Sequence, residues 1–279
     1  MKNRFILLLL VFGAVTASLA QKLEQSKKDR NLTLTQTYID DFKKIVIGED
    51  LDVELIYNKK PSVEIKADNN HHKHININVV DSVLSITTSK EIRIKKLKIK
   101  VNYSDNFSSI EVKGNAEVRS LTSLELNNAS LKTSGSARAY LNIKANNFNF
   151  VSTEKTKAKL NVTADNVIVE ISDNTKLDAL INATDLKMDL YQRTNATIEG
   201  EVKNLNLRID NDSQLSGKNL SAKTCTILAE MDSNVYIQVT DYISIDASGS
   251  SEVYLFGNPK ITINSFTGTT KLKKKEKQS

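Results

Sequence analysis

Short segments in which apolar and polar residues alternate run along most of the chain. In the first part they include residues 45–47, 51–57, 75–79 and 92–101. Alternation with a period of two residues is typical of a β-strand that has one buried and one solvated face. The alternation slips by one residue at Lys95-Lys96, which predicts a β-bulge there. Since helical periodicity is weak after residue 20, the pattern predicts an all-β protein.

From residue 110 onward, pairs of apolar residues separated by one residue recur at a regular interval. Between the first pair and the last, eight steps cover residues 110 to 261, which is about 19 residues a step. A repeat of this length predicts a parallel β-helix, a solenoid in which each coil supplies short strands. The pairs begin at Ile110, Leu131, Phe148, Val167, Leu186, Leu205, Cys225, Ile243 and Ile261.

The start of the chain has the form of a secretory signal peptide. Lys2 and Arg4 precede an apolar run, and small residues lead to Ala20. Later segments are too short and too polar to span a membrane. We therefore predict export to the periplasm or the cell surface. The segments that we predict are a signal peptide (1–20), a linker (21–37), an N-terminal β region that caps or extends the solenoid (38–109), the coils (110–265) and a basic tail (266–279).

Charge and cysteine content exclude several classes of protein. The net charge is +6, but the leader and the last nine residues carry all of this excess. The neutral remainder disfavours a nucleic-acid-binding domain. The single cysteine, Cys225, allows neither a disulfide framework nor a cysteine metal cluster. Because Cys225 takes an apolar position of its coil, we expect a buried and unreactive thiol.

Three stretches of the sequence carry a family resemblance. The stretch ASGSSEVYLFGNPK at 247–260 has a related copy, SGSARAYL, at 134–141, and FKKIVIGEDLDVELIYNKKPSVEIKADNN opens the β region at 42–70. With these stretches the chain resembles, over about residues 38–265, a family of exported bacterial proteins called auto-transporter adhesins with a head GIN domain. The resemblance implies a right-handed parallel β-helix and export in a Gram-negative bacterium. It implies no catalytic residues.

All the histidines lie close together. His71, His72 and His74 are candidate ligands for zinc, copper or nickel, with Asp68 as a fourth ligand. However, adjacent histidines on a strand would point to opposite faces. We therefore favour an exposed, solvated loop over a metal site.

A column of charged residues follows from the stacking of the coils. Asp212 and Asp232 would lie in neighbouring coils and repel each other unless a cation such as calcium bound between them. Carboxylates in a row also allow a catalytic role on an acidic polysaccharide. Because charges of both signs occur in the column, we favour a structural ladder. The column consists of the residues seven positions after the first residue of each apolar pair: Glu117, Arg138, Lys155, Asn174, Arg193, Asp212, Asp232 and Ser250.

Two basic segments are candidates for binding a polyanion such as lipopolysaccharide or an acidic glycan. One lies at residues 90–100 and the other in the tail. The alternative is that their lysines form the solvated side of strands and discourage strand addition. The candidate residues are Arg93, Lys95, Lys96, Lys98, Lys100, Lys273, Lys274 and Lys275.

The sequence thus predicts an exported, non-enzymatic surface or periplasmic protein that acts as an adhesin or binds a glycan or a cell-envelope protein. We expect no cofactor and no nucleic acid partner. The alternatives are a polysaccharide lyase or hydrolase on the same scaffold and a structural envelope protein without a ligand. A groove lined by aromatic and acidic residues would favour the enzyme, whereas a flat face rich in Asn, Ser and Thr would favour binding.

Overall fold

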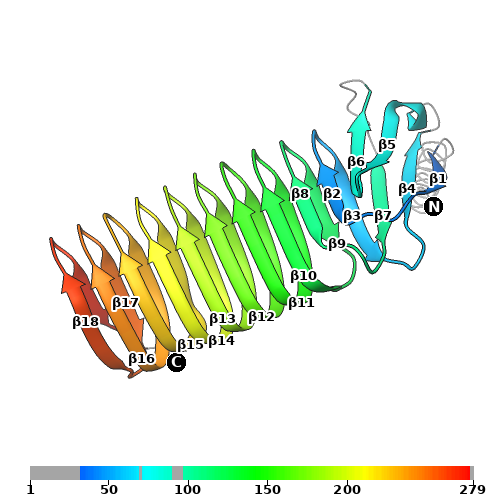
Figure 1. The fold of residues 1–279 in the computed structure, drawn as a ribbon. Coiled ribbons are helices and arrows are strands. Elements are labelled where there is room, and N and C mark those ends of the chain that lie inside the picture. The colour runs from blue at the N-terminus through cyan, green and yellow to red at the C-terminus, as the bar shows by residue number, and fades with distance from the viewer. Residues whose placement is uncertain (1–31, 69–70, 90–96, 277–279) are drawn as a thin grey trace, which may run out of the picture.

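The strands of the chain are stacked into a long column (Figure 1). The computed structural model describes residues 32–68, 71–89 and 97–276. The strands belong to one continuous 19-stranded sheet that winds around the column. This parallel β-solenoid, with turns roughly 19 residues apart, confirms the predicted fold class. The predicted signal peptide and the predicted bulge at Lys95-Lys96 lie outside the described residues.

The N-terminal region and the coils contain strands of different lengths. The first group is β1 Leu32–Tyr38, β2 Lys44–Ile47, β3 Asp52–Tyr57, β4 Ser62–Asp68, β5 Ile75–Val80, β6 Val83–Thr88 and β7 Lys98–Tyr103, with the 3₁₀ helix η1 His72–His74 before β5. The second group is β8 Ser109–Val112, β9 Glu117–Ser120, β10 Leu124–Thr133, β11 Arg138–Ser152, β12 Lys157–Ile171, β13 Lys176–Leu190, β14 Asn195–Ile209, β15 Gln214–Ala229, β16 Asn234–Ala247, β17 Glu252–Phe256, β18 Lys260–Phe266 and β19 Lys271–Lys274.

Each long strand covers two sides of its coil because it bends near its middle. In β11 the ladder to β12 is interrupted at Asn146, where the chain turns from one side to the other. We call face A the side formed by β6, β2, β8, the second parts of β10 to β16, and β18. Face B is the side formed by β7, β3, β9, the first parts of β10 to β16, β17 and β19. A tight turn joins face A to face B in each coil.

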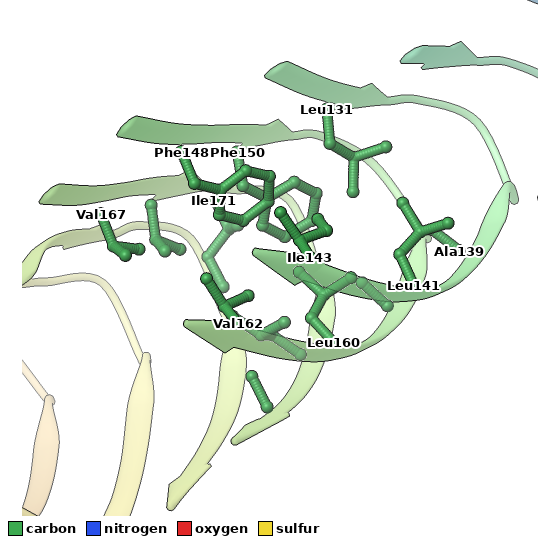
Figure 2. Packing of buried hydrophobic residues seen from close by; sticks show 14 of the residues in the cluster. Leu131, Ala139, Leu141, Ile143, Phe148, Phe150, Leu160, Val162, Val167 and Ile171 are labelled. Carbon is green, nitrogen blue, oxygen red and sulfur yellow. The ribbon is translucent and has the colours of Figure 1, made fainter. Parts of the chain in front are cut away.

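The core fills the space between the two faces (Figure 2). Apolar side chains from both faces point inward, and equivalent residues of successive coils lie in register, such as Leu141 with Leu160 and Ile143 with Val162. Phe150 is fully buried, and burial of each such side chain stabilises the fold by about 2 kcal/mol. Cys225 is also buried here, and its desolvation raises the pKa of the thiol. The predicted inward position of Cys225 is thus confirmed.

The N-terminal strands both extend and cap the column. The coil of β2 and β3 lies between β6–β7 on one side and β8–β9 on the other, with parallel pairing throughout. Beyond it, β5 pairs antiparallel with β6, β4 with β7, and β1 with β4. Strand β1 occupies residues 32–38, within and just after the segment interpreted as a linker. Three antiparallel strands therefore close this end of the column.

The other end of the column is formed by β18 and β19. Strand β18 pairs in parallel with β16, and β19 pairs in parallel with β17. The segment interpreted as a basic tail thus contains a strand, and Lys271–Lys274 form part of the last coil. Among the described residues, no helix is long and apolar enough to span a membrane.

Candidate functional site

The outer surface of face A carries a ladder of amide side chains at the corner where each coil turns from face B. Asn147 donates to Asn128 over 2.8 Å, and Asn166 donates to Asn147 over 2.9 Å. Further along the column, Asn204 donates to Asp185 over 2.7 Å and Thr224 donates to Asn204 over 2.9 Å. Because the coils place these residues at the same offset, one polar row runs along the column.

Most asparagines of the described chain do not serve the turns between strands. Asparagine tolerates the left-handed backbone that such turns require. In the described residues only Asn174 and Asn211 have a positive φ among the asparagines. The asparagines of the ladder lie in strands, and their contribution is side-chain hydrogen bonding between coils.

A shallow hollow lies beside this ladder on face A. Its volume is about 340 Å3. Exposed amide and hydroxyl groups surround the side chain of Ile168, which is 39% exposed. We call this place the amide hollow. It is lined by Ser108, Ser109, Asn128, Ala129, Ser130, Asn147, Phe148, Asn149, Asn166 and Ile168.

Two buried carboxylates of face A, those of Glu111 and Asp189, are held by lysines. Glu111 contacts Lys44 at 2.5 Å and Lys113 at 2.8 Å, and these hydrogen bonds lower the pKa of Glu111 to about 2. Asp189 contacts Lys187 at 2.9 Å, and this bond raises the pKa of the lysine. Each carboxylate therefore serves as a fixed anion within a pair.

The predicted charged column is only partly assembled. Glu117 accepts from Arg138 over 2.7 Å, as expected for neighbouring coils, and also from Arg119 over 2.5 Å. In the ladder between β11 and β12, Arg138 aligns with Lys157 and not with Lys155. Lys155 and the later members of the column therefore lie in the turns rather than on face B. Extending one column from Glu117 through Lys155 was therefore wrong. The cause is a two-residue error of alignment at Leu131, which pairs with Phe150 instead of Phe148.

The candidate calcium residues are surface residues. Asp212 and Asp232 lie in neighbouring turns, and both are exposed. In the part of the chain that the structure describes, no three His, Cys, Asp or Glu side chains come together as a metal-binding group.

The three histidines do not converge on one point. The ring nitrogens of His72 lie 2.8 Å from the hydroxyl of Thr33 and 3.0 Å from that of Thr35, so His72 ties the η1 turn to β1. His71 Nδ1 lies 4.0 Å from Asp68 Oδ2, whereas His74 Nδ1 lies 3.3 Å from Ser89 Oγ. His72 and His74 belong to η1, His71 directly precedes it, and all three residues are half-buried.

The basic candidates that the structure describes lie at opposite ends of the column. Lys98 and Lys100 belong to β7 near the N-terminal end, and Lys100 contacts Glu64 at 2.6 Å. Lys98 is exposed. Arg93, Lys95 and Lys96 lie outside the described residues. The two basic segments therefore do not form one site.

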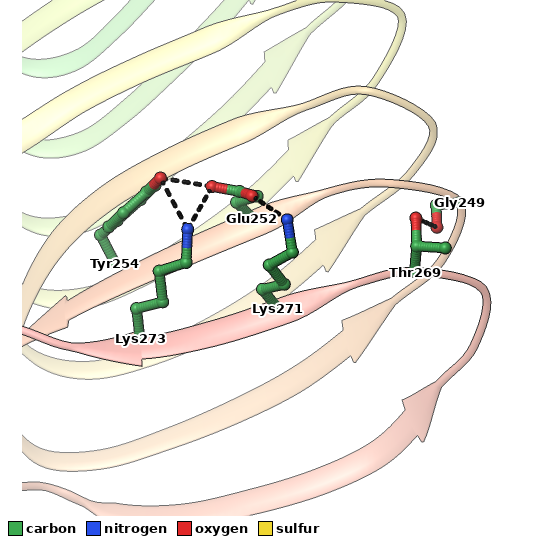
Figure 3. Close-up of polar contacts among 6 residues, drawn as sticks. All are labelled: Gly249, Glu252, Tyr254, Thr269, Lys271 and Lys273. Carbon is green, nitrogen blue, oxygen red and sulfur yellow. Dashed lines mark hydrogen bonds and ion pairs between the residues drawn. The ribbon is translucent and has the colours of Figure 1, made fainter.

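The C-terminal lysines surround Glu252 and Tyr254 (Figure 3). Lys271 and Lys273 each contact Glu252 at 2.8 Å and lower its pKa to about 2. Lys273 also lies 4.8 Å from the centre of the Tyr254 ring, and Lys275 lies 5.4 Å from it. Lys271, Lys274 and Lys275 are exposed residues. Part of this positive charge is thus neutralised within the last two coils.

Sequence reasoning missed a row of buried hydroxyl groups beneath the turns. Thr175 donates to the carbonyl oxygen of Ser172 over 2.7 Å, and Ser233 donates to that of Glu230 over 2.6 Å. An alignment in steps of about 19 residues would have revealed Ser or Thr at this place. The row consists of Thr156, Thr175, Thr194, Ser213, Ser233 and Ser251, all fully buried.

The family comparison agrees with this architecture. A family model described as "Putative auto-transporter adhesin, head GIN domain" matches residues 41–180 and 152–259, which is most of the chain. The chain belongs to this family. The resemblance seen in the sequence is therefore confirmed. No curated protein matches the chain.

Solved structures share the fold of this head GIN domain protein at low sequence identity. A putative adhesin from Parabacteroides merdae has a TM-score of 0.66 and 15% identity, with 88% of this chain and 97% of that chain covered. A putative lipid binding protein from Parabacteroides distasonis has a TM-score of 0.62 and 16% identity, with coverage of 88% and 97%. A putative adhesin from the same species has a TM-score of 0.59 and 19% identity, with coverage of 87% and 96%.

Proposed function

We propose that this protein is an exported, non-enzymatic binding module that acts as an adhesin and holds a glycan on face A. The observation that carries the proposal is the outer surface of face A, where the amide ladder runs beside the amide hollow. A flat face of this composition is the feature that the sequence associated with binding rather than catalysis. The family description and the adhesins of the same fold support an adhesin-like role.

The chemistry of face A suits the hydroxyl groups of a sugar. Each asparagine side chain offers two N–H donors and a carbonyl oxygen with two lone pairs, and the ladder uses only some of them. Sugar hydroxyls both donate and accept, so they fit the remaining positions. Ile168 adds an apolar contact for the C–H face of a sugar ring. Because coils repeat about every 4.8 Å, a polymer has several equivalent places to bind, which strengthens attachment through multivalency.

The alternative functions receive less support. Glycoside hydrolysis commonly uses two carboxyl groups that flank the bond to be cleaved. On face A, Glu111 and Asp189 are each paired with lysine instead of with another carboxylate. One relative of the same fold is described as lipid binding, but the amide ladder runs along the outer surface of face A. If the chain binds no ligand, the result would favour the alternative of a purely structural envelope protein.

The test is a glycan array probed with the chain from residue 21 to 279. We expect retention of a defined set of glycans, and a loss of affinity of at least about tenfold when Asn149→Ala and Asn166→Ala are combined in the hollow. The matched control is Asn161→Ala, an exposed asparagine of face B. Thermal melting of each variant separates lost binding from lost folding. Equal binding by the two variants, or no glycan bound, would refute the proposal.

A further inference from the structure

The C-terminal end of the solenoid leaves core positions uncovered. In β16 the inward residues Ile243 and Ile245 are fully buried, and they align with Ile261 and Ile263 of β18. Those two side chains are 43% and 49% exposed, and Phe266 is 38% exposed. The last coil therefore presents an apolar surface where every earlier coil is covered by the next one.

The same end presents unpaired backbone groups. Between coils, the carbonyl oxygens of inward residues accept hydrogen bonds from the next coil, as Ala247 does from Thr267 over 3.0 Å and Leu255 does from Lys275 over 2.9 Å. In the last coil the corresponding inward residues are Ile261 and Ile263. In the described chain no further strand follows β18 along the column (Figure 1). An edge of this kind is a template for an added strand.

The charge of this end indicates the nature of the occupant. Lys260 precedes the inward residue Ile261 on β18, so its side chain points outward along the free edge, where the residue is exposed. Lys274 lies on β19 of face B, where it aligns with the buried residue Leu255 and takes an inward position. Within the described residues, no ion pair joins Lys260, Lys274 or Lys275 to an acidic side chain. A strand added to β18 places its outward side chains beside Lys260, so carboxylates at these positions would pair with the ammonium group.

A second copy of the chain fits this end poorly. Two C-terminal ends would bring their lysines together, and inward lysines on an edge oppose such pairing. The N-terminal end is already closed by the antiparallel strands β1, β4 and β5. A lipid surface also fits poorly, because hydrocarbon cannot satisfy the backbone groups of the edge. A β-strand satisfies these groups and covers the apolar side chains at the same time.

We propose that the free edge of β18 is a docking site for a β-strand of a partner protein in which apolar residues alternate with Asp or Glu. The strand extends the solenoid by strand addition, with its apolar residues over Ile261, Ile263 and Phe266 and its acidic residues on the outward side, beside Lys260. This site lies at the end of the column, away from the amide hollow, and it does not depend on glycan binding.

The test uses a fluorescein-labelled synthetic peptide of nine residues in which Val or Ile alternates with Asp or Glu. Binding to the chain from residue 21 to 279 is measured by fluorescence anisotropy. The comparison peptide has the same composition with its apolar residues grouped together. We expect the alternating peptide to bind at least about tenfold more tightly, because only that peptide matches the two-residue period of the edge.

Variants locate the peptide on the structure. Ile263→Asp and Lys260→Glu should each weaken binding at least about tenfold, by placing an acid on the apolar edge and by removing the outward cation beside the acidic residues of the peptide. The matched control is Ile168→Asp, which alters an exposed isoleucine in the amide hollow and should leave peptide binding unchanged. Conversely, Ile168→Asp should weaken glycan binding while Ile263→Asp should not, so the two proposals fail separately. Melting curves check that the variants fold.

Three results would overturn the proposal. The first is equal binding, or no binding, of the two peptides. The second is binding to vesicles of phosphatidylcholine and phosphatidylglycerol that Ile263→Asp abolishes while the alternating peptide does not compete. The third is a doubled mass in light scattering that Ile263→Asp returns to the monomer, which would assign the edge to a second copy.

Discussion

At the scale of single residues, the tight turn of each coil requires a left-handed backbone, and the coils meet this requirement with different residues. Met231 has a φ of 56°, whereas the equivalent residue of the next coil, Gly249, has a φ of 72°. A left-handed conformation costs a residue with a Cβ about 1–2 kcal/mol. The two turns are in close contact, because a Cβ on Gly249 would lie 2.8 Å from the Cα of Met231.

Replacement of Met231 by glycine should stabilise the protein. The side chain is 56% exposed, so little buried area is lost, while the strain of the left-handed backbone is relieved. We expect the free energy of unfolding to increase by about 1 kcal/mol in urea denaturation. Met231→Ala, which keeps the Cβ, is the control and should give no gain. Equal stability of the glycine and alanine variants would show that the turn is not strained.

At the scale of the strands, Glu111 connects two segments that are far apart in the sequence. It lies on β8, and its carboxylate contacts Lys44 of the neighbouring strand β2. Lys113 at 2.8 Å completes the group. Since β2 and β8 are joined through five intervening strands of the N-terminal region, this pair helps to hold the first coil in place.

The pH dependence of stability should reveal this contact. The pKa of Glu111 is lowered from 4.5 to about 2 in the folded chain, so its stabilising effect is complete above about pH 4.5 and disappears as the pH falls toward 2. We expect Glu111→Gln to reduce the free energy of unfolding by about 1–3 kcal/mol at pH 7, with the difference from wild type shrinking between pH 5 and pH 2. Glu170→Gln, an exposed change on the same face, is the control. A constant difference across this range would contradict the assignment.

The strands also show what the sequence allows to be predicted. Alternation and the interval of about 19 residues predicted the solenoid, the inward position of Cys225 and N-terminal strands that cap or extend the coils. The alignment at Leu131 was wrong because the matching inward residue of its coil is Ala129, whose small side chain does not stand out in an apolar pattern. The insertion of β2–β3 between later strands leaves no periodic signal, since it depends on pairing between distant segments.

The candidate site was less predictable than the fold. The sequence showed that asparagine is abundant, but the ladder of Asn128, Asn147 and Asn166 depends on which residues lie at the corner and point outward. A period of two residues gives the facing of a strand, whereas the position of the bend near Asn146 comes from the three-dimensional coil. The exposed C-terminal end of the column could not be predicted from the sequence either, because Ile261 and Ile263 have the same pattern as the buried pairs before them.

At the scale of the whole molecule, the column should be least stable at its open end. In a solenoid each coil contacts only its neighbours, so the last coil has half the support of an internal one. The N-terminal end differs because β1, β4 and β5 cover it. Strand β13, in contrast, pairs along its length with both β12 and β14. Local unfolding should therefore start at β18 and β19 and spread toward the centre.

Hydrogen exchange measures this gradient directly. We expect the protected amides of β18 and β19 to exchange at least about 100-fold faster than those of β13, because opening the last coil breaks contacts on one side only. The strands of the capped end provide the comparison, and β6 should exchange more slowly than β18. If the alternating peptide adds to β18, it should slow exchange there and leave β6 unchanged. Uniform exchange along the column would mean that the solenoid opens as one unit and that its free edge carries no local weakness.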